Sequence, residues 1–193
     1  MKNADRTALT RGRLIAVARA LFAEHGYAGT STEAILQGTE LGRGALYHHF
    51  RDKADLFEAV CQQICEEAVP VVNAEADRGR DAYSSLVRGS LAWVEFMTRP
   101  EVRQIIVVDA PTVLGWERWE ALDQRLSYAA LREGLHIAIR DGRLKFGCSL
   151  DMAATLVNGG LNAIALRAGA PSAPAPRSEW ERAVRTLFDA FRV

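Results

Sequence analysis

Apolar residues recur at intervals of three and four along most of the chain, which is the spacing of amphipathic helices. The first such stripe predicts a helix from about Thr10 to His25, and Gly26 is expected to end it. The stripe consists of Leu14, Ala18 and Leu21. Residues 1–9 are polar and lack this period, so we expect a flexible arm there.

Two short helical segments are expected next, on either side of a turn. Thr30 and Glu33 have the spacing of a capping box, which predicts a helix start with Thr30 as the N-cap. The segment Gly38–Gly42 then interrupts the helical pattern, and a second helix is expected from about Arg43. Two short helices joined by a tight turn that contains glycine form a helix-turn-helix arrangement.

The second short helix carries side chains suited to contact with nucleic acid. Leu46 and Phe50 lie four residues apart and would hold one face of the helix on the domain. The other faces carry Arg43, Gly44, Ala45, Tyr47 and His48. Small residues permit a close approach, whereas Arg, Tyr and His reach phosphates and base edges. From the spacing alone, a helical bundle that never contacts nucleic acid is an equally good interpretation.

The remaining hydrophobic stripes predict further helices and therefore an all-α fold. One stripe begins at Lys53, after the cap Asp52, and is expected to be kinked or broken at Pro70. A second follows the cap Asp81, and two more span 116–140 and 150–168. The last begins at a capping box of Ser178 and Glu181. The run Val102–Val108 is β-branched and fits a strand, but helices on both sides favour a short buried helix.

Residues 11–60 resemble the DNA-binding domain of the TetR family of transcriptional regulators. The resemblance is carried, in order, by Leu21–Tyr27, Gly29–Ser31, Ile35, Gly44, Leu46–Phe50, Asp52–Lys53 and Leu56. The turn departs from the family pattern, because Thr39-Glu40 stands where Ala-Gly is usual and Gly42 replaces a hydroxyl cap. A Glu with positive φ is less stable than Gly by about 1 kcal/mol. Replacing a hydroxyl N-cap by Gly costs only about a few tenths of a kcal/mol.

The resemblance implies an all-α protein with a three-helix DNA-binding domain at residues 1–55 and a helical regulatory and dimerisation domain at 56–193. It implies a homodimeric repressor that binds a palindromic double-stranded DNA operator and is released by a small-molecule effector. In such a protein Thr30, Ser31, Tyr47, His48 and Lys53 would contact phosphates, and Arg43, Gly44 and Ala45 would face base edges. The last two helices would pair with their copies across the dimer axis. Burial of the final apolar stripe within one chain is an equal alternative.

Large apolar side chains in the middle of the chain are candidates for a ligand pocket. They are Trp93, Phe96, Met97, Trp116 and Trp119, and they favour a largely apolar effector. Aromatic residues at helical spacing more often form core, so this alternative stays open.

Composition and motifs narrow the function classes further. The formal net charge is zero, and the three cysteines have no disulfide or metal-site spacing, which fits a cytoplasmic protein. We expect no membrane span, metal site, cofactor or catalytic residue, and so no enzyme. Two alternatives are a DNA-binding dimer without an effector, and a ligand-binding or enzymatic helical domain with a vestigial DNA-binding motif.

Overall fold

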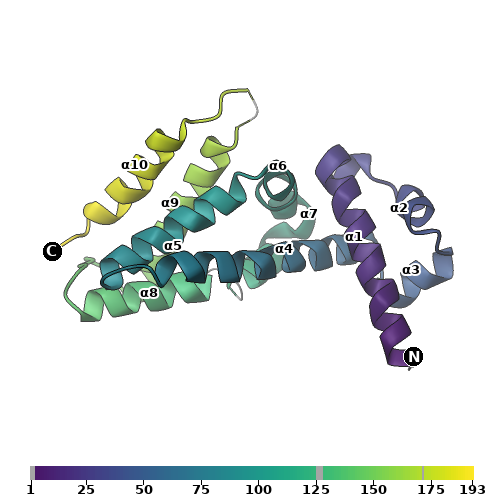
Figure 1. Ribbon diagram of the computed structural model, residues 1–193, viewed down its shortest axis with the longest axis horizontal. Coiled ribbons are helices and arrows are strands. Elements are labelled where there is room, and N and C mark those ends of the chain that lie inside the picture. The colour runs from purple at the N-terminus through teal and green to yellow at the C-terminus, as the bar shows by residue number, and fades with distance from the viewer. Residues whose placement is uncertain (1–2, 125–127, 171) are drawn as a thin grey trace. The chain divides into compact units, whose positions relative to one another are not determined.

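The computed structural model describes residues 3–124, 128–170 and 172–193, except for the side chains of residues 3, 4 and 116 (Figure 1). The described chain is helical, apart from one isolated bridge between Leu144 and Arg192. It forms two compact units. Unit 1 comprises Met1–Ile64 and Pro100–Trp119, and unit 2 comprises Cys65–Arg99 and Glu120–Val193. Within the described residues, no helix combines the length and the apolar character that crossing a membrane requires.

Unit 1 is built around its first helix, which packs against four other elements. Its elements are α1 (Asn3–Gly29), α2 (Thr32–Thr39), α3 (Arg43–His49), the first half of α4 (Lys53–Ala76), α6 (Pro100–Val102), the π-helix η1 (Arg103–Asp109) and most of α7 (Ala110–Asp123). Helix α1 contacts α2, α3, α6 and η1. Phe22 and Phe57 are fully buried in its core, with an edge-to-face ring contact at 5.1 Å.

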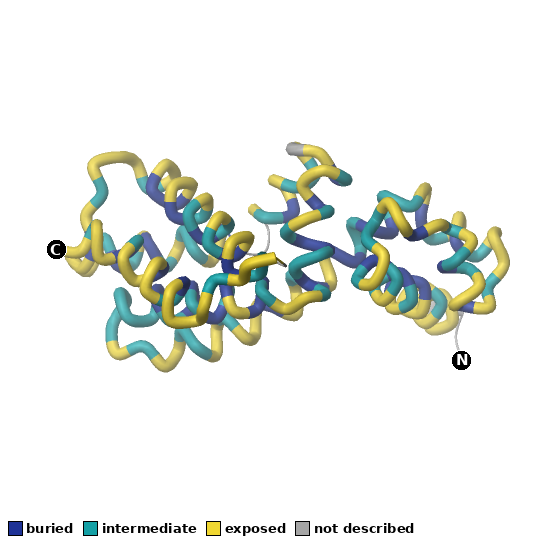
Figure 2. Tube along the Cα trace, turned by 90° about the horizontal axis from the view of Figure 1, so that it is seen from above, coloured by how far each residue is buried: buried dark blue, intermediate teal, exposed yellow. Residues whose placement is uncertain are grey.

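Unit 2 is a helical bundle centred on α5. Its elements are the second half of α4, then α5 (Ala82–Met97), α8 (Ala129–Arg140), α9 (Leu150–Ala168) and α10 (Arg177–Asp189). Helix α5 packs against α8, α9 and α10. Buried positions recur along one side of each helix (Figure 2). The apolar stripe of α10, which consists of Trp180, Val184 and Phe188, is buried within the protomer. Of the two alternatives for the final apolar stripe, burial within one chain therefore applies to most of its residues.

Several predicted helix boundaries are wrong. Helix α1 begins at Asn3, so the expected flexible arm of residues 1–9 is largely helical; its residues include no helix breaker after Asn3. The N-cap of α2 is Ser31 and not Thr30. The box of Ser178 and Glu181 does not open α10 either, because α10 starts at Arg177 and Glu181 accepts a hydrogen bond from that arginine.

The middle of the chain also departs from the prediction. Residues 103–109 are helical as favoured, but they form a π-helix. Of the single helix predicted for 116–140, residues 116–124 and 128–140 are helical and belong mainly to α7 and α8, whereas residues 125–127 lie outside the described part. Helix α4 runs through Pro70, which is exposed, so the predicted break is absent. By contrast, the predicted cap Asp81 and the bounds of α9 are confirmed.

Candidate DNA-binding and ligand sites

Helix α3 is held by two side chains and exposes most of the others. Leu46 is fully buried and Phe50 nearly so. Arg43, Gly44, Tyr47 and His48 are exposed, with Tyr47 51% accessible, and Ala45 is half-buried. A Cβ placed on Gly44 would meet nothing within 4 Å, so this side of the helix is open to another surface. The arrangement is the one expected from the sequence for a helix that enters a groove.

The turn before α3 has the backbone that its unusual sequence predicts. Glu40 has φ 55° and ψ 27°, and it is the one non-glycine residue with positive φ among those described. Its carboxylate pairs with Arg13 at 3.3 Å on an exposed surface. Gly42 is the N-cap of α3 and offers no side-chain hydrogen bond. The predicted strain and the missing hydroxyl cap are therefore both present.

Two of the residues predicted to contact phosphates, Thr30 and Lys53, make hydrogen bonds within unit 1. Thr30 is only 2% exposed, and its hydroxyl donates to the carbonyl oxygens of Leu21 at 3.1 Å and Gly26 at 2.9 Å. The ammonium of Lys53 donates to the carbonyls of Tyr27 at 2.9 Å and Thr30 at 2.8 Å. Burial lowers the pKa of Lys53. Thr30 thus binds the connection between α1 and α2 to the end of α1, and Lys53 binds it to α4.

Ser31 and Arg43 are the better placed of the polar candidates. The exposed hydroxyl of Ser31 accepts from the Ala34 N–H at 3.0 Å and keeps its own proton for another acceptor. Arg43 is exposed and donates to the carboxylate of Glu33, whose pKa is lowered first by its own backbone N–H and then by Arg43. An exposed pair of this kind is weak enough to be exchanged for a phosphate or a base.

The returning segment of unit 1 is fixed to the helix-turn-helix by polar contacts. The Tyr27 N–H donates to the Asp109 carboxylate at 2.8 Å. The neighbouring Gly26 has φ 69°, and a Cβ there would lie 3.4 Å from the amide of Gln104, so glycine fits both the conformation and the space. Arg118 donates to Glu58 of α4 at 2.8 Å. The segment 100–119 is thus an integral part of this unit.

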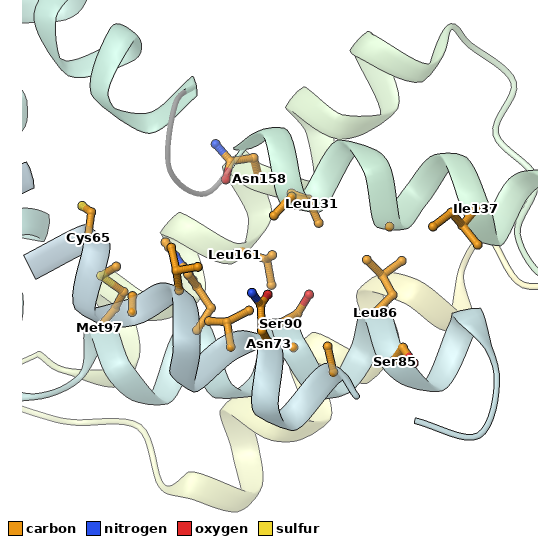
Figure 3. A pocket seen from close by; sticks show the side chains of 18 of the residues that line it. Cys65, Asn73, Ser85, Leu86, Ser90, Met97, Leu131, Ile137, Asn158 and Leu161 are labelled. Carbon is orange, nitrogen blue, oxygen red and sulfur yellow. The ribbon is translucent and has the colours of Figure 1, made fainter. Parts of the chain in front are cut away.

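Unit 2 contains a cavity of about 340 Å³ lined by α4, α5, α8 and α9 (Figure 3). Most of the lining is aliphatic or small. Its polar side chains are Cys65, Asn73, Ser85, Ser90 and Asn158. The volume lies within the range of small-molecule sites. Trp93 and Met97 are the aromatic and sulfur-containing groups of α5 that face it.

The outer face of α9 carries a second unusual surface. Met152, Leu156 and Leu166 are 60%, 52% and 48% exposed, and with the exposed Gly159 and Ala163 they follow a heptad-like spacing. We call these five residues the α9 stripe. The neighbouring Gly160 faces the opposite way, where a Cβ would lie 3.0 Å from Leu187 of α10. Gly160 therefore permits the close contact of α9 with α10 within the chain, whereas Gly159 lies on the exposed α9 stripe.

Two sequence profiles of known protein families match this chain. A sequence profile of the bacterial regulatory proteins of the tetR family matches residues 14–60, and a profile of tetracyclin repressor-like C-terminal domains matches residues 83–191. The chain belongs to the TetR family. The TetR-family transcriptional regulator of Pectobacterium atrosepticum has a similar structure, with a TM-score of 0.82 and 30% identity over 100% of this chain and 98% of that one.

Two curated HTH-type transcriptional repressors match over shorter stretches. The repressor AcnR of Corynebacterium glutamicum is 36% identical over 69 residues, which is 36% of this chain and 37% of AcnR. The repressor Rv1474c of Mycobacterium tuberculosis is 30% identical over 112 residues, 58% of this chain and 59% of that protein. The chain thus spans less than two thirds of each. TetR-family proteins are transcriptional regulators that bind DNA operators as dimers and respond to small molecules, so the family confirms the prediction of a regulator rather than an enzyme.

The predicted ligand residues of this TetR-family chain are only partly brought together. Trp93 and Met97 line the cavity, whereas Phe96 is buried elsewhere on α5 and stacks with Arg99. Trp119 does not line it, and the side chain of Trp116 lies outside the described part. The small lining residues, such as Gly89 and Gly134, and the polar ones on α4, α5 and α9 were not predicted from the sequence. The prediction of the pocket relied on aromatic residues, whereas the volume of the cavity exists because small side chains line it.

Proposed function

We propose that this protein is a homodimeric repressor that binds a palindromic operator and leaves it when a small, largely apolar effector fills the cavity of unit 2. The observation that carries the proposal is α3, where the buried Leu46 and Phe50 leave Arg43, Tyr47 and His48 exposed inside the segment that matches the family profile. Residues 1–55 would serve DNA binding and 56–193 regulation and dimerisation. Such a protein works in the cytoplasm, beside the chromosome.

The exposed residues of α3 have separate roles in this proposal. Arg43, Gly44 and Ala45 face base edges in the major groove, because they occupy the first turn of the helix, which enters deepest in this motif. Tyr47 and His48 contact phosphates. Ser31 contacts another phosphate at the N-terminus of α2, where the helix dipole favours an anion.

Thr30 and Lys53 act mainly by positioning in the proposed complex. Both hold the backbone between α1 and α2, and Lys53 keeps one of its three N–H donors for a phosphate. Their substitution is therefore expected to weaken DNA binding at all sequences alike, since neither reads a base.

The α9 stripe is the proposed dimer surface. Exposed apolar side chains in a continuous row favour a partner, and the small Gly159 and Ala163 permit a close approach of a second helix. A two-fold dimer would present its two α3 helices to half-sites about 34–36 Å apart, or to a multiple of that spacing.

Regulation is proposed to pass along the chain where it leaves the cavity. Met97 lines the cavity, and Pro100 begins the segment that packs on α1 in unit 1. Likewise Cys65 lines the cavity and follows Ile64, the last residue of unit 1 on α4. An effector that binds one conformation better shifts the population toward it. A coupling of about 1–3 kcal/mol lowers operator affinity 5–150-fold.

Selection of bound duplexes from random DNA tests the proposal. We expect enrichment of a palindrome and, for Arg43→Ala, loss of preference at one base pair in each half-site by about 1–3 kcal/mol. Arg182→Ala, which removes an exposed arginine of α10, is the matched control and should leave the preference unchanged. If no duplex is enriched by the wild type, the protein is not a sequence-specific DNA-binding protein.

A further inference from the structure

The lining of the unit 2 cavity lacks a charge to pair with a ligand ion. Among the residues that the structure describes, its one ionisable side chain is the thiol of Cys65. Burial, and to a smaller extent the nearby Asp123 and Glu66, raise the pKa of Cys65 to about 12, so the thiol is neutral at physiological pH. A charged ligand would lose its hydration here without gaining a counter-charge. The cavity is therefore suited to an uncharged molecule.

One polar group of the lining is held in a fixed orientation. The amide nitrogen of Asn158 donates to the Asp123 carboxylate at 2.7 Å. Because a carboxylate oxygen accepts hydrogen bonds, this contact settles which end of the amide is nitrogen. The carbonyl oxygen of Asn158 is then turned away from Asp123. Asn158 and Leu161, which are three residues apart on the same face of α9, both line the cavity, so this oxygen is the acceptor that Asn158 can offer to a ligand.

A second polar group faces the cavity from α5. Ser90 is only 6% exposed, and its hydroxyl makes no hydrogen bond to any described residue. A hydroxyl that lines a cavity can donate to or accept from a polar group of a ligand there. Figure 3 shows Ser90 beside Asn73 of α4, with Asn158 at another part of the lining. Polar contacts are thus available from a few side chains on a mainly apolar wall.

The volume limits the size of the occupant. A buried cavity of roughly 150 Å³ accepts one benzene ring. The cavity of about 340 Å³ is a little over twice as large, which corresponds to a compact molecule of two rings. A long chain or a polycyclic ligand would need further space.

Resting on the proposed function, these observations narrow the effector class. We propose that the effector is an uncharged molecule of about two rings with at least one hydroxyl or N–H group, which donates a hydrogen bond to the carbonyl oxygen of Asn158. Its apolar body fills the space between α5 and α8, and Ser90 binds a second polar group where one is present. Asp123 is a positioning residue, because it orients the amide of Asn158 without lining the cavity.

Four probes with one ring system test the class on the full-length protein. They are 2-naphthol, naphthalene, 2-naphthoate and 2-naphthylmethylammonium, with binding measured by calorimetry. We expect 2-naphthol to bind roughly tenfold more tightly than naphthalene, in keeping with one well-placed hydrogen bond in a buried site. The anion and the cation should bind at least roughly tenfold more weakly than 2-naphthol.

Variants of α9 test the assigned residue. Asn158→Leu should abolish the advantage of 2-naphthol over naphthalene and leave naphthalene affinity within about threefold. Asp123→Asn should reduce the same advantage, because an amide partner no longer fixes the orientation of Asn158. Asn162→Leu is the matched control, since it removes an asparagine one turn further along α9 that does not line the cavity. It should change neither affinity.

The outcomes separate the effector class from the function on which it rests. Equal or tighter binding of either charged probe overturns the uncharged class, and a preference that survives in Asn158→Leu overturns the assigned acceptor. If none of the probes binds while the wild type still enriches a palindromic duplex, the proposed effector class is wrong and the proposed DNA-binding function is retained. If 2-naphthol binds as expected but no duplex is enriched, the cavity assignment stands and the repressor is wrong.

Discussion

The two units use their polar and apolar side chains in opposite ways. In unit 1 two buried or half-buried polar groups of the helix-turn-helix have partners: the hydroxyl of Thr30 bonds carbonyls of α1, and the ammonium of Lys53 bonds the carbonyls of Tyr27 and Thr30, although Nε of Arg103 in the same unit is buried without a described partner. In unit 2 the hydroxyl of Ser90, a residue that is only 6% exposed, faces the cavity. Unit 2 also exposes a row of apolar side chains on α9, whereas unit 1 exposes mainly polar residues on α3.

This difference indicates which surfaces are incomplete. A polar group with its hydrogen bonds made needs nothing further, but a hydroxyl that faces a cavity can bond an occupant, and an exposed apolar row is stabilised by burial. Unit 2 is therefore the part whose stability and conformation should depend on a ligand and on a second copy of the chain. Unit 1 should be stable without either.

The largest effect is expected at the α9 stripe. Leu156→Arg places a charge in the middle of the proposed dimer surface, so the dissociation constant of the dimer should rise about 100-fold or more. Sedimentation velocity over a concentration series measures it. Leu9→Arg, at an equally exposed leucine of α1, is the control and should leave the dimer intact. A variant at Leu156 that sediments as the wild type would show that the interface lies elsewhere.

The next effect concerns the network of unit 1. Lys53→Met keeps most of the side-chain volume but removes two charge-assisted hydrogen bonds and the stacking of the ammonium 4.0 Å over the Tyr27 ring. We expect a loss of about 2 kcal/mol in the free energy of unfolding. Urea unfolding measures this loss, and Lys145→Met, at an exposed lysine of unit 2, should change it by less than about 0.5 kcal/mol. Equal effects in the two variants would contradict the role of Lys53.

The same difference explains what could be predicted from the sequence. The proposed DNA-binding surface comes from one continuous stretch, so local spacing placed Leu46 and Phe50 inward and Arg43 outward correctly. The cavity is assembled from four helices distant in sequence, and no local pattern reports the space between them. Helical spacing could not tell Phe96, which is buried away from the cavity, from Met97, which lines it. Nor could it decide that the α10 stripe is buried within the chain.

A matched pair of hydroxyl removals tests the comparison between the units directly. Thr30→Val is nearly isosteric and leaves two carbonyls without their donor, so we expect a loss of about 1–2 kcal/mol in stability. Ser90→Ala removes a hydroxyl that has no described partner, and the change should be within about 0.5 kcal/mol of zero. Thermal or urea unfolding of both variants measures the difference. If Ser90→Ala is as destabilising as Thr30→Val, Ser90 is a structural residue and not a ligand contact.

The smallest effect should appear at Glu40, the one non-glycine residue of unit 1 with positive φ among those that the structure describes. Glu40 has φ 55°, a conformation that glycine adopts without penalty, and its exposed pair with Arg13 contributes little in return. Glu40→Gly should therefore raise the free energy of unfolding by about 0.5–1 kcal/mol, less the greater flexibility of glycine in the unfolded chain. Glu40→Ala removes the same carboxylate but keeps the strain, so it should be no more stable than the wild type. If the Ala variant gains as much as the Gly variant, the charge of Glu40 and not its backbone is the source of the penalty.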